Sequence, residues 1–171
     1  MDSFKSIENI IKTKEEILSY EGYPKTVILN LNDDNFDRWS LKANKNRIIT
    51  ISISQPADYC ISSLNDHTIC IKTPYSDIIN LHINDIEPHT LNNILFSIAL
   101  SYEAGARSSN VIKGLHNYND LDGRFSIEKG YHGSKIIDSS YNANPHSFIA
   151  SINSLVKLDC EPWLVMGEMG E

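Results

Sequence analysis

The hydrophobic residues near the N-terminus of the chain recur at helical spacing. Between residues 4 and 18 they fall on one stripe with a period of about 3.6 residues, which predicts an amphipathic helix. One position on this stripe is not apolar, and it is Lys14. The apolar members of the stripe are Phe4, Ile7, Ile10, Ile11, Ile17 and Leu18.

The next segment predicts a strand, a helix and a second strand. Thr26 to Leu29 is a β-branched, apolar run, and Arg47 to Ile53 alternates between polar and apolar positions. Between them, the polar loop Asn30 to Asp34 leads into apolar positions at helical spacing from Phe36 to Ala43. In such a βαβ unit, ligands gather at the carboxyl ends of the strands. We therefore expect a candidate site at the loop from Asn30 to Asp34.

The middle of the chain predicts a hairpin followed by two helices. Two apolar runs, Ile69 to Thr73 and Ile78 to Ile83, flank a Pro-Tyr-Ser-Asp turn, which predicts antiparallel strands at an edge of the sheet. The apolar stripe from Leu91 to Tyr102 predicts a long helix, with Thr90 as its N-cap and Gly105 as its stop. A shorter helix is expected at residues 110–116.

The pattern restarts near Asp122, where we expect a domain boundary between residues 1–122 and 123–171. Ile136 and Ile137 form the centre of a predicted strand. Asn144 and Pro145 supply an N-cap and a first-turn proline for a helix, and Trp163 to Met166 predicts the next strand. These elements predict a second βαβ unit and an α/β fold.

Composition narrows the classes of partner. The net charge is -7 and no run is rich in lysine or arginine, so we expect no nucleic acid partner. No apolar run is long enough to span a bilayer, and the N-terminus has no apolar signal region, so we expect no membrane insertion. The 3 cysteines are widely spaced and predict neither a zinc site nor a disulfide framework. A cytoplasmic protein with a small-molecule or protein partner is expected.

Lys14 is the first candidate for chemistry. A lysine on an apolar helical stripe loses hydration, which favours its neutral amine over the ammonium ion. A neutral amine can be carbamylated. The alternative is that the lysine stem lies along the edge of the core while the charged head reaches water.

The second candidate is the loop Ser140 to Pro145, which follows a predicted strand ending in Asp138 and precedes a predicted helix. The amide groups at a helix N-terminus bind anions, and the amide and acidic side chains nearby suit sugar hydroxyls. The alternative is that this segment only caps the helix.

The third candidate is a polar pair at the start of the long helix. His89 and Asn93 can both exchange hydrogen bonds with a heteroaromatic base. The alternative is that His89 is only a local hydrogen-bonding partner.

One further string, Gly130 to Lys135, is rich in glycine. It lacks the GxxxxGK[ST] order that wraps phosphates, so no P-loop is predicted.

Taken together, these segments resemble the Mur ligase family over nearly the whole chain. The most specific string is SYNANP at Ser140 to Pro145, which is similar to the DDSYNANP motif of the members that add D-alanyl-D-alanine to the peptidoglycan precursor. Thr13 to Ile17 is similar to the family's AKxEI, and Val165 to Glu171 to its VLGDMGE. The resemblance implies that residues 1–122 are the C-terminal part of a central ATPase domain with a mixed sheet. Residues 123–171 would begin a Rossmann-like domain.

The resemblance also implies a set of site residues. Lys14 falls on the lysine that the family carbamylates to help hold Mg2+. His89 and Asn93 fall on the HNxxN pair beside the adenine of ATP. The other positions that the resemblance implies for ATP binding are Asn30 and Asp33 of the NADD element, Arg124 at the domain hinge, and Asp138, Tyr141, Asn142 and Asn144 of the SYNANP segment.

Three positions depart from the family's pattern. Ser139 stands where DDSYNANP has its second aspartate, a ribose contact. Thr90 replaces the asparagine of the HN pair, and Asn32 replaces the first aspartate of NADD. The departures bear on nucleotide affinity, because all three positions lie in elements that the family places at ATP.

The implied activity is ATP-dependent formation of an amide bond. The carboxylate of UDP-N-acetylmuramoyl-tripeptide would be phosphorylated to an acyl phosphate, which the amine of D-alanyl-D-alanine attacks. Because the chain contains no P-loop, we expect an internal stretch of such an enzyme that is inactive alone, with a complementary N-terminal fragment as a partner. The alternatives are another Mur-type or folylpolyglutamate-type ligase, which SYNANP disfavours, and a degenerate or split-gene fragment without catalysis.

Overall fold

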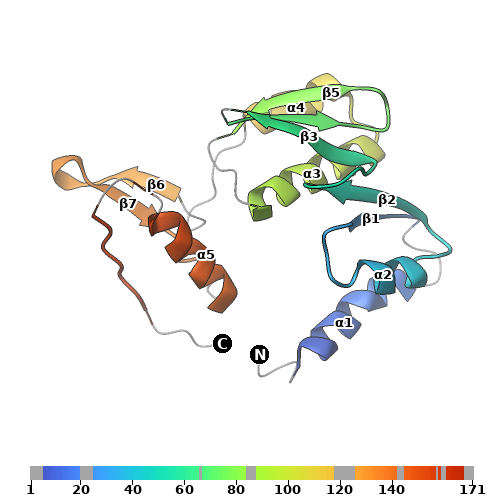
Figure 1. Ribbon diagram of the computed structural model, residues 1–171, viewed down its shortest axis with the longest axis horizontal. Coiled ribbons are helices and arrows are strands. Elements are labelled where there is room, and N and C mark those ends of the chain that lie inside the picture. The colour runs from blue at the N-terminus through green and yellow to red at the C-terminus, as the bar shows by residue number, and fades with distance from the viewer. Residues whose placement is uncertain are drawn as a thin grey trace. The chain divides into compact units, whose positions relative to one another are not determined.

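The computed structural model describes residues 6–19, 25–65, 67–83, 88–117, 126–141, 145–156, 158 and 161–167. They belong to two compact units, a larger one at Phe4–Asn117 and a smaller one within Tyr118–Glu171. Figure 1 shows the larger unit from blue to yellow and the smaller unit in orange and red. The boundary predicted near residue 122 lies outside the described residues.

A five-stranded mixed sheet in the order β1-β2-β3-β4-β5 forms the centre of the larger unit. β1 (Thr26–Asn30), β2 (Arg47–Ser52) and β3 (Tyr59–Asn65) run parallel to one another. β4 (Thr68–Lys72) is antiparallel to both β3 and β5 (Ile78–His82). The predicted strands of the βαβ unit and the predicted hairpin are therefore confirmed.

β3 is the strand of the larger unit that the sequence did not predict. Only its first half is buried, and Ser62 to Asn65 are exposed, so its pattern of polar positions is not that of a strand. Because β3 pairs with β4, β4 is an interior strand. β5 is the outermost strand, so the predicted hairpin at the edge of the sheet is confirmed.

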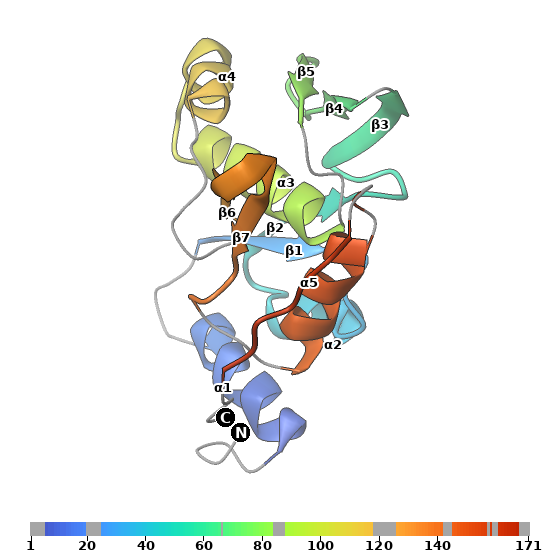
Figure 2. The ribbon, with the colours of Figure 1, turned by 90° about the vertical axis from the view of Figure 1, so that its left-hand side faces the viewer.

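Helices cover both faces of the parallel part of the sheet. On one face, Val27 and Leu29 of β1 pack with Phe36 and Trp39 of α2 (Phe36–Lys42). α1 (Ile7–Ser19) packs against α2. Figure 2 shows α2 and α3 on opposite sides of β1 and β2.

The other face is covered by α3 (Pro88–Glu103), with α4 (Ser108–His116) packed against α3 and β5. Ile28 points to this face and joins the main core, as expected for alternation along a strand. The fully buried members of this core come from four strands and α3, and they are Ile51, Tyr59, Ile69, Ile71, Ile79, Leu95, Ile98 and Ala99.

The ends of α3 show one wrong and one confirmed prediction. The helix begins at Pro88, so Thr90 lies inside it and is not the N-cap. A proline is well suited to the first helical turn, where its missing N–H loses no bond. Gly105 follows the helix with φ +87°, as the predicted stop requires. α4 begins two residues earlier than predicted, at Ser108.

The smaller unit contains an antiparallel hairpin and a helix. β6 (Ser126–Lys129) pairs with β7 (Lys135–Asp138), and α5 spans Pro145–Val156. The strand predicted at Trp163 to Met166 is not formed, because no described strand pairs with this exposed segment. The expected second βαβ unit is thus a β-hairpin followed by a helix, in which β6 was not predicted.

Candidate functional site

The carboxyl end of β1 meets the first turns of α3. The side-chain amide of Asn30, the last residue of β1, donates a hydrogen bond of 3.3 Å to Oδ1 of Asn92. These two residues are 62 positions apart in the sequence, and both are half-buried. The structure therefore joins the predicted strand-end loop to the predicted polar start of α3.

Asn92, which makes this contact, was not among the predicted site residues. The predicted pair, His89 and Asn93, is exposed, and its spacing of four places both residues on one face of α3. Asn92 lies three positions after His89, about one helical turn away. That spacing is the signal that could have identified it.

Asn32 joins the ends of β1 and β2. Its Oδ1 accepts hydrogen bonds from Ser52 Oγ at 2.9 Å and from the backbone N–H of Ile53 at 3.1 Å, and its Nδ2 donates to Ser54 Oγ at 2.7 Å. An aspartate could accept the first two bonds and could also accept a proton from the Ser54 hydroxyl, which can donate as well as accept. The asparagine at this position thus joins the same strand ends without adding a negative charge.

Asp33 stabilises the turn that leads into α2. Its Oδ1 accepts the backbone N–H of Asn35 at 2.8 Å and the side-chain amide of Asn35 at 3.2 Å. An aspartate side chain that bonds the backbone two residues ahead is a common turn device. Asp33 therefore has a local role beside any role in binding.

Lys14 is exposed, which contradicts the expectation that it is desolvated on a buried stripe. The residue of α1 that is buried is its neighbour Glu15, which is only 1% exposed. The helix is thus rotated relative to the prediction, since successive residues point about 100° apart around an α-helix. The argument from burial does not apply to Lys14.

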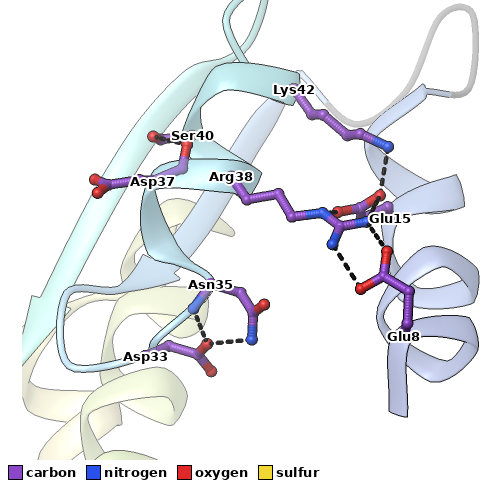
Figure 3. A network of polar contacts seen from close by, with 8 residues as sticks. All are labelled: Glu8, Glu15, Asp33, Asn35, Asp37, Arg38, Ser40 and Lys42. Carbon is purple, nitrogen blue, oxygen red and sulfur yellow. Dashed lines mark hydrogen bonds and ion pairs between the residues drawn. The ribbon is translucent and has the colours of Figure 1, made fainter. Parts of the chain in front are cut away.

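Glu15 is held by two cations of α2, as Figure 3 shows. Arg38 donates to Glu15 Oε2 at 3.2 Å, and the ammonium of Lys42 forms an ion pair with the same carboxylate. Arg38 also contacts Glu8, in the first turn of α1, at 2.9 and 3.0 Å. These four charged side chains connect the two helices, and we name them the α1–α2 ion network.

The ion pairs of this network favour the charged forms of Glu8, Glu15 and Arg38. Hydrogen bonds from Lys42 and then from Arg38 hold the pKa of Glu15 below its usual value, although burial acts in the opposite direction. Hydrogen bonding to Arg38 lowers the pKa of Glu8 in the same way. The pKa of Arg38 is raised by its two acidic partners, chiefly Glu8.

At the other end of the sheet, Glu103 collects several donors. Its carboxylate accepts hydrogen bonds from the hydroxyls of Tyr75 at 3.1 Å and Tyr59 at 3.4 Å, and it pairs with Arg47. The rings of Tyr75 and Tyr102 stack with centroids 5.6 Å apart. This cluster fastens the β4–β5 turn to the last turn of α3.

In the smaller unit, Asp138 ends β7 and accepts the backbone N–H of Ser140 at 2.9 Å. Hydrogen bonds from Ser140 lower the pKa of this carboxyl group. Tyr141 is exposed, and the hydroxyls of Ser139 and Ser151 lie 3.1 Å apart. The other predicted residues on this side, Arg124, Asn142 and Asn144, lie outside the described residues.

Two findings concern metals and membranes. Within the residues that the structure describes, no group of three or more His, Cys, Asp or Glu side chains is placed to hold a metal ion. None of the described helices has the length and apolar character needed to cross a membrane.

The chain is similar in sequence to known proteins. Residues 1–101 match the model of the Mur ligase middle domain. Over its whole length the chain is 27% identical to UDP-N-acetylmuramoyl-tripeptide--D-alanyl-D-alanine ligase of Escherichia coli K12, and it spans 39% of that relative.

Solved structures agree with this match at the level of the fold. MurF from Acinetobacter baumannii superposes with a TM-score of 0.75 at 22% identity, over 91% of this chain and 34% of that one. MurF ligase from Thermotoga maritima in complex with ADP gives a TM-score of 0.69 at 19% identity, over 90% of this chain and 36% of that one. The predicted α/β class, with a mixed sheet and helices, is confirmed. Because the middle-domain match covers more than half of the sequence, the chain belongs to the Mur ligase family.

Proposed function

We propose that this chain contributes part of the active site of an ATP-dependent ligase that joins D-alanyl-D-alanine to UDP-N-acetylmuramoyl-tripeptide. The observation that carries the proposal is the contact between Asn30 and Asn92, which brings the strand-end loop and the first turns of α3 to one place. The SYNANP string and the whole-length similarity to a ligase of that name support the choice of substrates. We place the reaction in the cytoplasm.

The larger unit, within residues 1–122, would be part of the central ATPase domain, and residues 123–171 would begin the C-terminal domain.

The polar edge of the larger unit could bind the adenine base of ATP. His89 and Asn93 are exposed on one face of α3 and offer donors and acceptors to a heteroaromatic base, with Asn30 and Asp33 at the neighbouring strand end.

The smaller unit would supply the remaining nucleotide contacts. Asp138 and Tyr141 are the described members of this set. Arg124, Asn142 and Asn144 would complete it.

Mg2+ does not fit the described residues by themselves, since they contain no group of three candidate ligands. What the chain offers is the exposed amine of Lys14. The ammonium ion first loses a proton to give the neutral amine. When that amine adds carbon dioxide, a nitrogen–carbon bond forms and a second proton is released, so a cationic side chain becomes an anionic carbamate. Carboxylate-like oxygens are the ligands that Mg2+ prefers.

In the proposed reaction, the carboxylate of the tripeptide attacks the γ-phosphorus of ATP and ADP leaves. The amine of D-alanyl-D-alanine then attacks the acyl phosphate, and phosphate leaves as the amide forms. Such a reaction needs cationic or backbone donors around the transferred phosphoryl group. The sequence of this chain contains no GxxxxGK[ST] string to provide them.

A second candidate is a protein without catalysis, derived from a ligase by degeneration or by splitting of its gene. Asn32 favours it, because a neutral amide stands at this position of the NADD element and bonds residues at the end of β2. Ser139 at the expected ribose contact favours it as well. A complementary N-terminal fragment would be the partner of such a chain.

The test uses Lys14 in the full-length ligase that carries this sequence. We expect Lys14→Ala to abolish ligation, and acetate or another short carboxylate to restore part of it. Lys14→Arg should fail too, because a guanidinium ion stays charged and cannot become a carbamate. The rate of amide formation from ATP, the UDP-muramoyl-tripeptide and D-alanyl-D-alanine is measured.

Two outcomes would contradict the proposal. Near-normal turnover by Lys14→Arg would remove Lys14 from the site. The chain of residues 1–171, tested alone with the three substrates, should not exceed a heat-killed control, because the phosphate clamp is not among its residues. Turnover that disappears on mutation of this chain would show that it is complete as a catalyst.

A further inference from the structure

α1 carries two neighbouring stripes, and the polar one faces the protein. The outer stripe contains Lys14 between isoleucines, and Ile7 and Ile17 are 62% and 67% exposed. The inner stripe contains Glu15, which is buried, and Leu18, which packs against the core of β1 and α2. At about 100° per residue, Ile7, Ile10, Lys14 and Ile17 form the outer stripe and Glu8, Ile11, Glu15 and Leu18 the inner one, with Ile10 and Ile11 both half-buried.

Hydrophobic burial alone favours the opposite rotation, because the outer stripe has more large apolar residues. The arrangement follows from the charges of α2 instead. Arg38 and Lys42 are spaced by four residues, so they project from the same face of α2 and enclose the carboxylate of Glu15. A buried carboxylate without such partners would be strongly destabilising. Facing Glu15 towards α2 therefore turns Lys14 outwards.

The same network also sets how far α1 is shifted along α2. Arg38 contacts both Glu15 and Glu8, which are seven positions apart, or about 10 Å along the helix. Figure 3 shows this guanidinium group between the two carboxylates. Sliding α1 by one turn would break at least one of these pairs. Rotation and axial register are thus both determined by the α1–α2 ion network.

α2 is in turn attached to the strand-end loop of the candidate site. Asp33 caps the turn before α2 through Asn35, and the backbone N–H of Phe36 donates to the carbonyl of Asp33 at 2.9 Å. Only this turn and the first part of α2 separate Asp33 from Arg38. The position of α1 relative to the loop that carries Asn30 is therefore fixed through α2.

From this geometry we infer that Glu15 is a positioning residue for Lys14: its ion pairs with Arg38 and Lys42 fix the rotation and axial register of α1, so that the lysine amine is exposed at a set position along the helix. The inference rests on the proposed role of Lys14. Glu15 itself touches no substrate. Its effect is on where the amine lies.

The experiment compares two acid-to-amide changes in the full-length ligase. Glu15→Gln removes the charge that Arg38 and Lys42 hold, whereas Asp37→Asn makes the same chemical change at an exposed position next to Arg38 on α2. We expect Glu15→Gln to lower kcat about tenfold while KM for ATP changes by less than about twofold, as for a displaced catalytic group. Asp37→Asn should leave both unchanged.

Reversing all four charges of the α1–α2 ion network separates positioning from folding. A variant with Glu8→Lys, Glu15→Lys, Arg38→Glu and Lys42→Glu keeps an opposite charge at each ion pair between the helices. It should recover most of the lost kcat, which a general loss of stability would not. Lysine labelling of the chain itself gives a second measurement: the acylation rate of Lys14 relative to Lys12 should change severalfold in Glu15→Gln and return in the charge-reversed variant.

The outcomes distinguish this inference from the proposed function. Normal kcat in Glu15→Gln together with an inactive Lys14→Ala overturns the positioning role alone. Normal kcat in Lys14→Ala overturns the proposed function. If Glu15→Gln does not fold, Glu15→Asp keeps the charge on a shorter side chain, and wild-type kcat and Lys14 labelling in that variant would also overturn the inference.

Discussion

Tyr59 is the most deeply buried phenol of the cluster around Glu103. Its side chain is fully buried, and its hydroxyl lies 3.4 Å from the Glu103 carboxylate. Burial, and then the negative charge of Glu103, raise the pKa of Tyr59 above its usual value of 10.0. The pKa of Tyr102 is raised as well, first by burial. Both tyrosines therefore stay protonated in the folded state at a pH where unfolded tyrosine ionises.

This shift predicts a loss of stability in alkali. A raised pKa in the folded state contributes stability that is fully present below the unfolded value near pH 10 and is lost as the pH rises towards the folded value. The thermal unfolding midpoint should therefore fall between about pH 9 and about pH 11, and Tyr59→Phe should reduce that fall. Equal falls in wild type and Tyr59→Phe would show that Tyr59 ionises freely.

At the scale of elements, the two exposed helix glycines have opposite roles. Gly105 ends α3 in a Schellman motif. The N–H of Gly105 donates to the carbonyl of Tyr102 at 2.8 Å, and the N–H of Ala106 donates to the carbonyl of Ser101 at 2.9 Å. Its φ of +87° is one that other residues rarely adopt. Gly114 lies inside α4, and no φ in the left-handed region is found there.

The same substitution should therefore change stability in opposite directions. An added Cβ meets no atom within 4 Å at either glycine, so packing does not enter the comparison. Gly105→Ala should lower the free energy of unfolding by about 1 kcal/mol through backbone strain. Gly114→Ala should raise it by roughly 0.5–1 kcal/mol through helix propensity. Urea unfolding of both variants measures the difference, and a shared sign would contradict the assignment of Gly105 as the helix stop.

At the scale of the whole molecule, the two units differ in how much apolar surface they cover. The larger unit buries side chains from four strands and α3 in one core. In the smaller unit a two-stranded sheet and one helix leave large apolar side chains exposed, among them Ile127, Ile136, Ile149 and Trp163. A two-stranded sheet of this kind is marginally stable in water.

Amide hydrogen exchange should therefore separate the units. We expect the backbone amides of β4, at the centre of the larger core, to exchange more than about tenfold more slowly than those of β6 and β7. Mass spectrometry of peptides from each strand after timed exchange measures the difference, with β5 as an edge strand from the larger unit for comparison. Equal protection of β4 and β7 would mean that both units open together.

Local patterns predicted most of the elements and the polar loop of the candidate site. Alternation and helical spacing identified β1, β2, the β4–β5 hairpin and the α-helices, because these patterns depend on which residues must be buried within a single element. Gly105 was identified as a stop for the same kind of reason, since only its own backbone conformation is involved. The polar loop after β1 was predicted because any ligand site in a βαβ unit lies at that end of the strands.

Tertiary structure decided the features that depend on a second element. β3 and β6 carry weak patterns and exist as strands because β4 and β7 pair with them, whereas Trp163 to Met166 has a strand-like pattern but no described partner. Asn92 joined the site through Asn30, 62 positions away. The spacing of α1 predicted a helix but not its rotation, because the ion pairs of Glu15 with α2 outweigh the burial of its isoleucines, and no pattern within α1 contains the charges of Arg38 and Lys42.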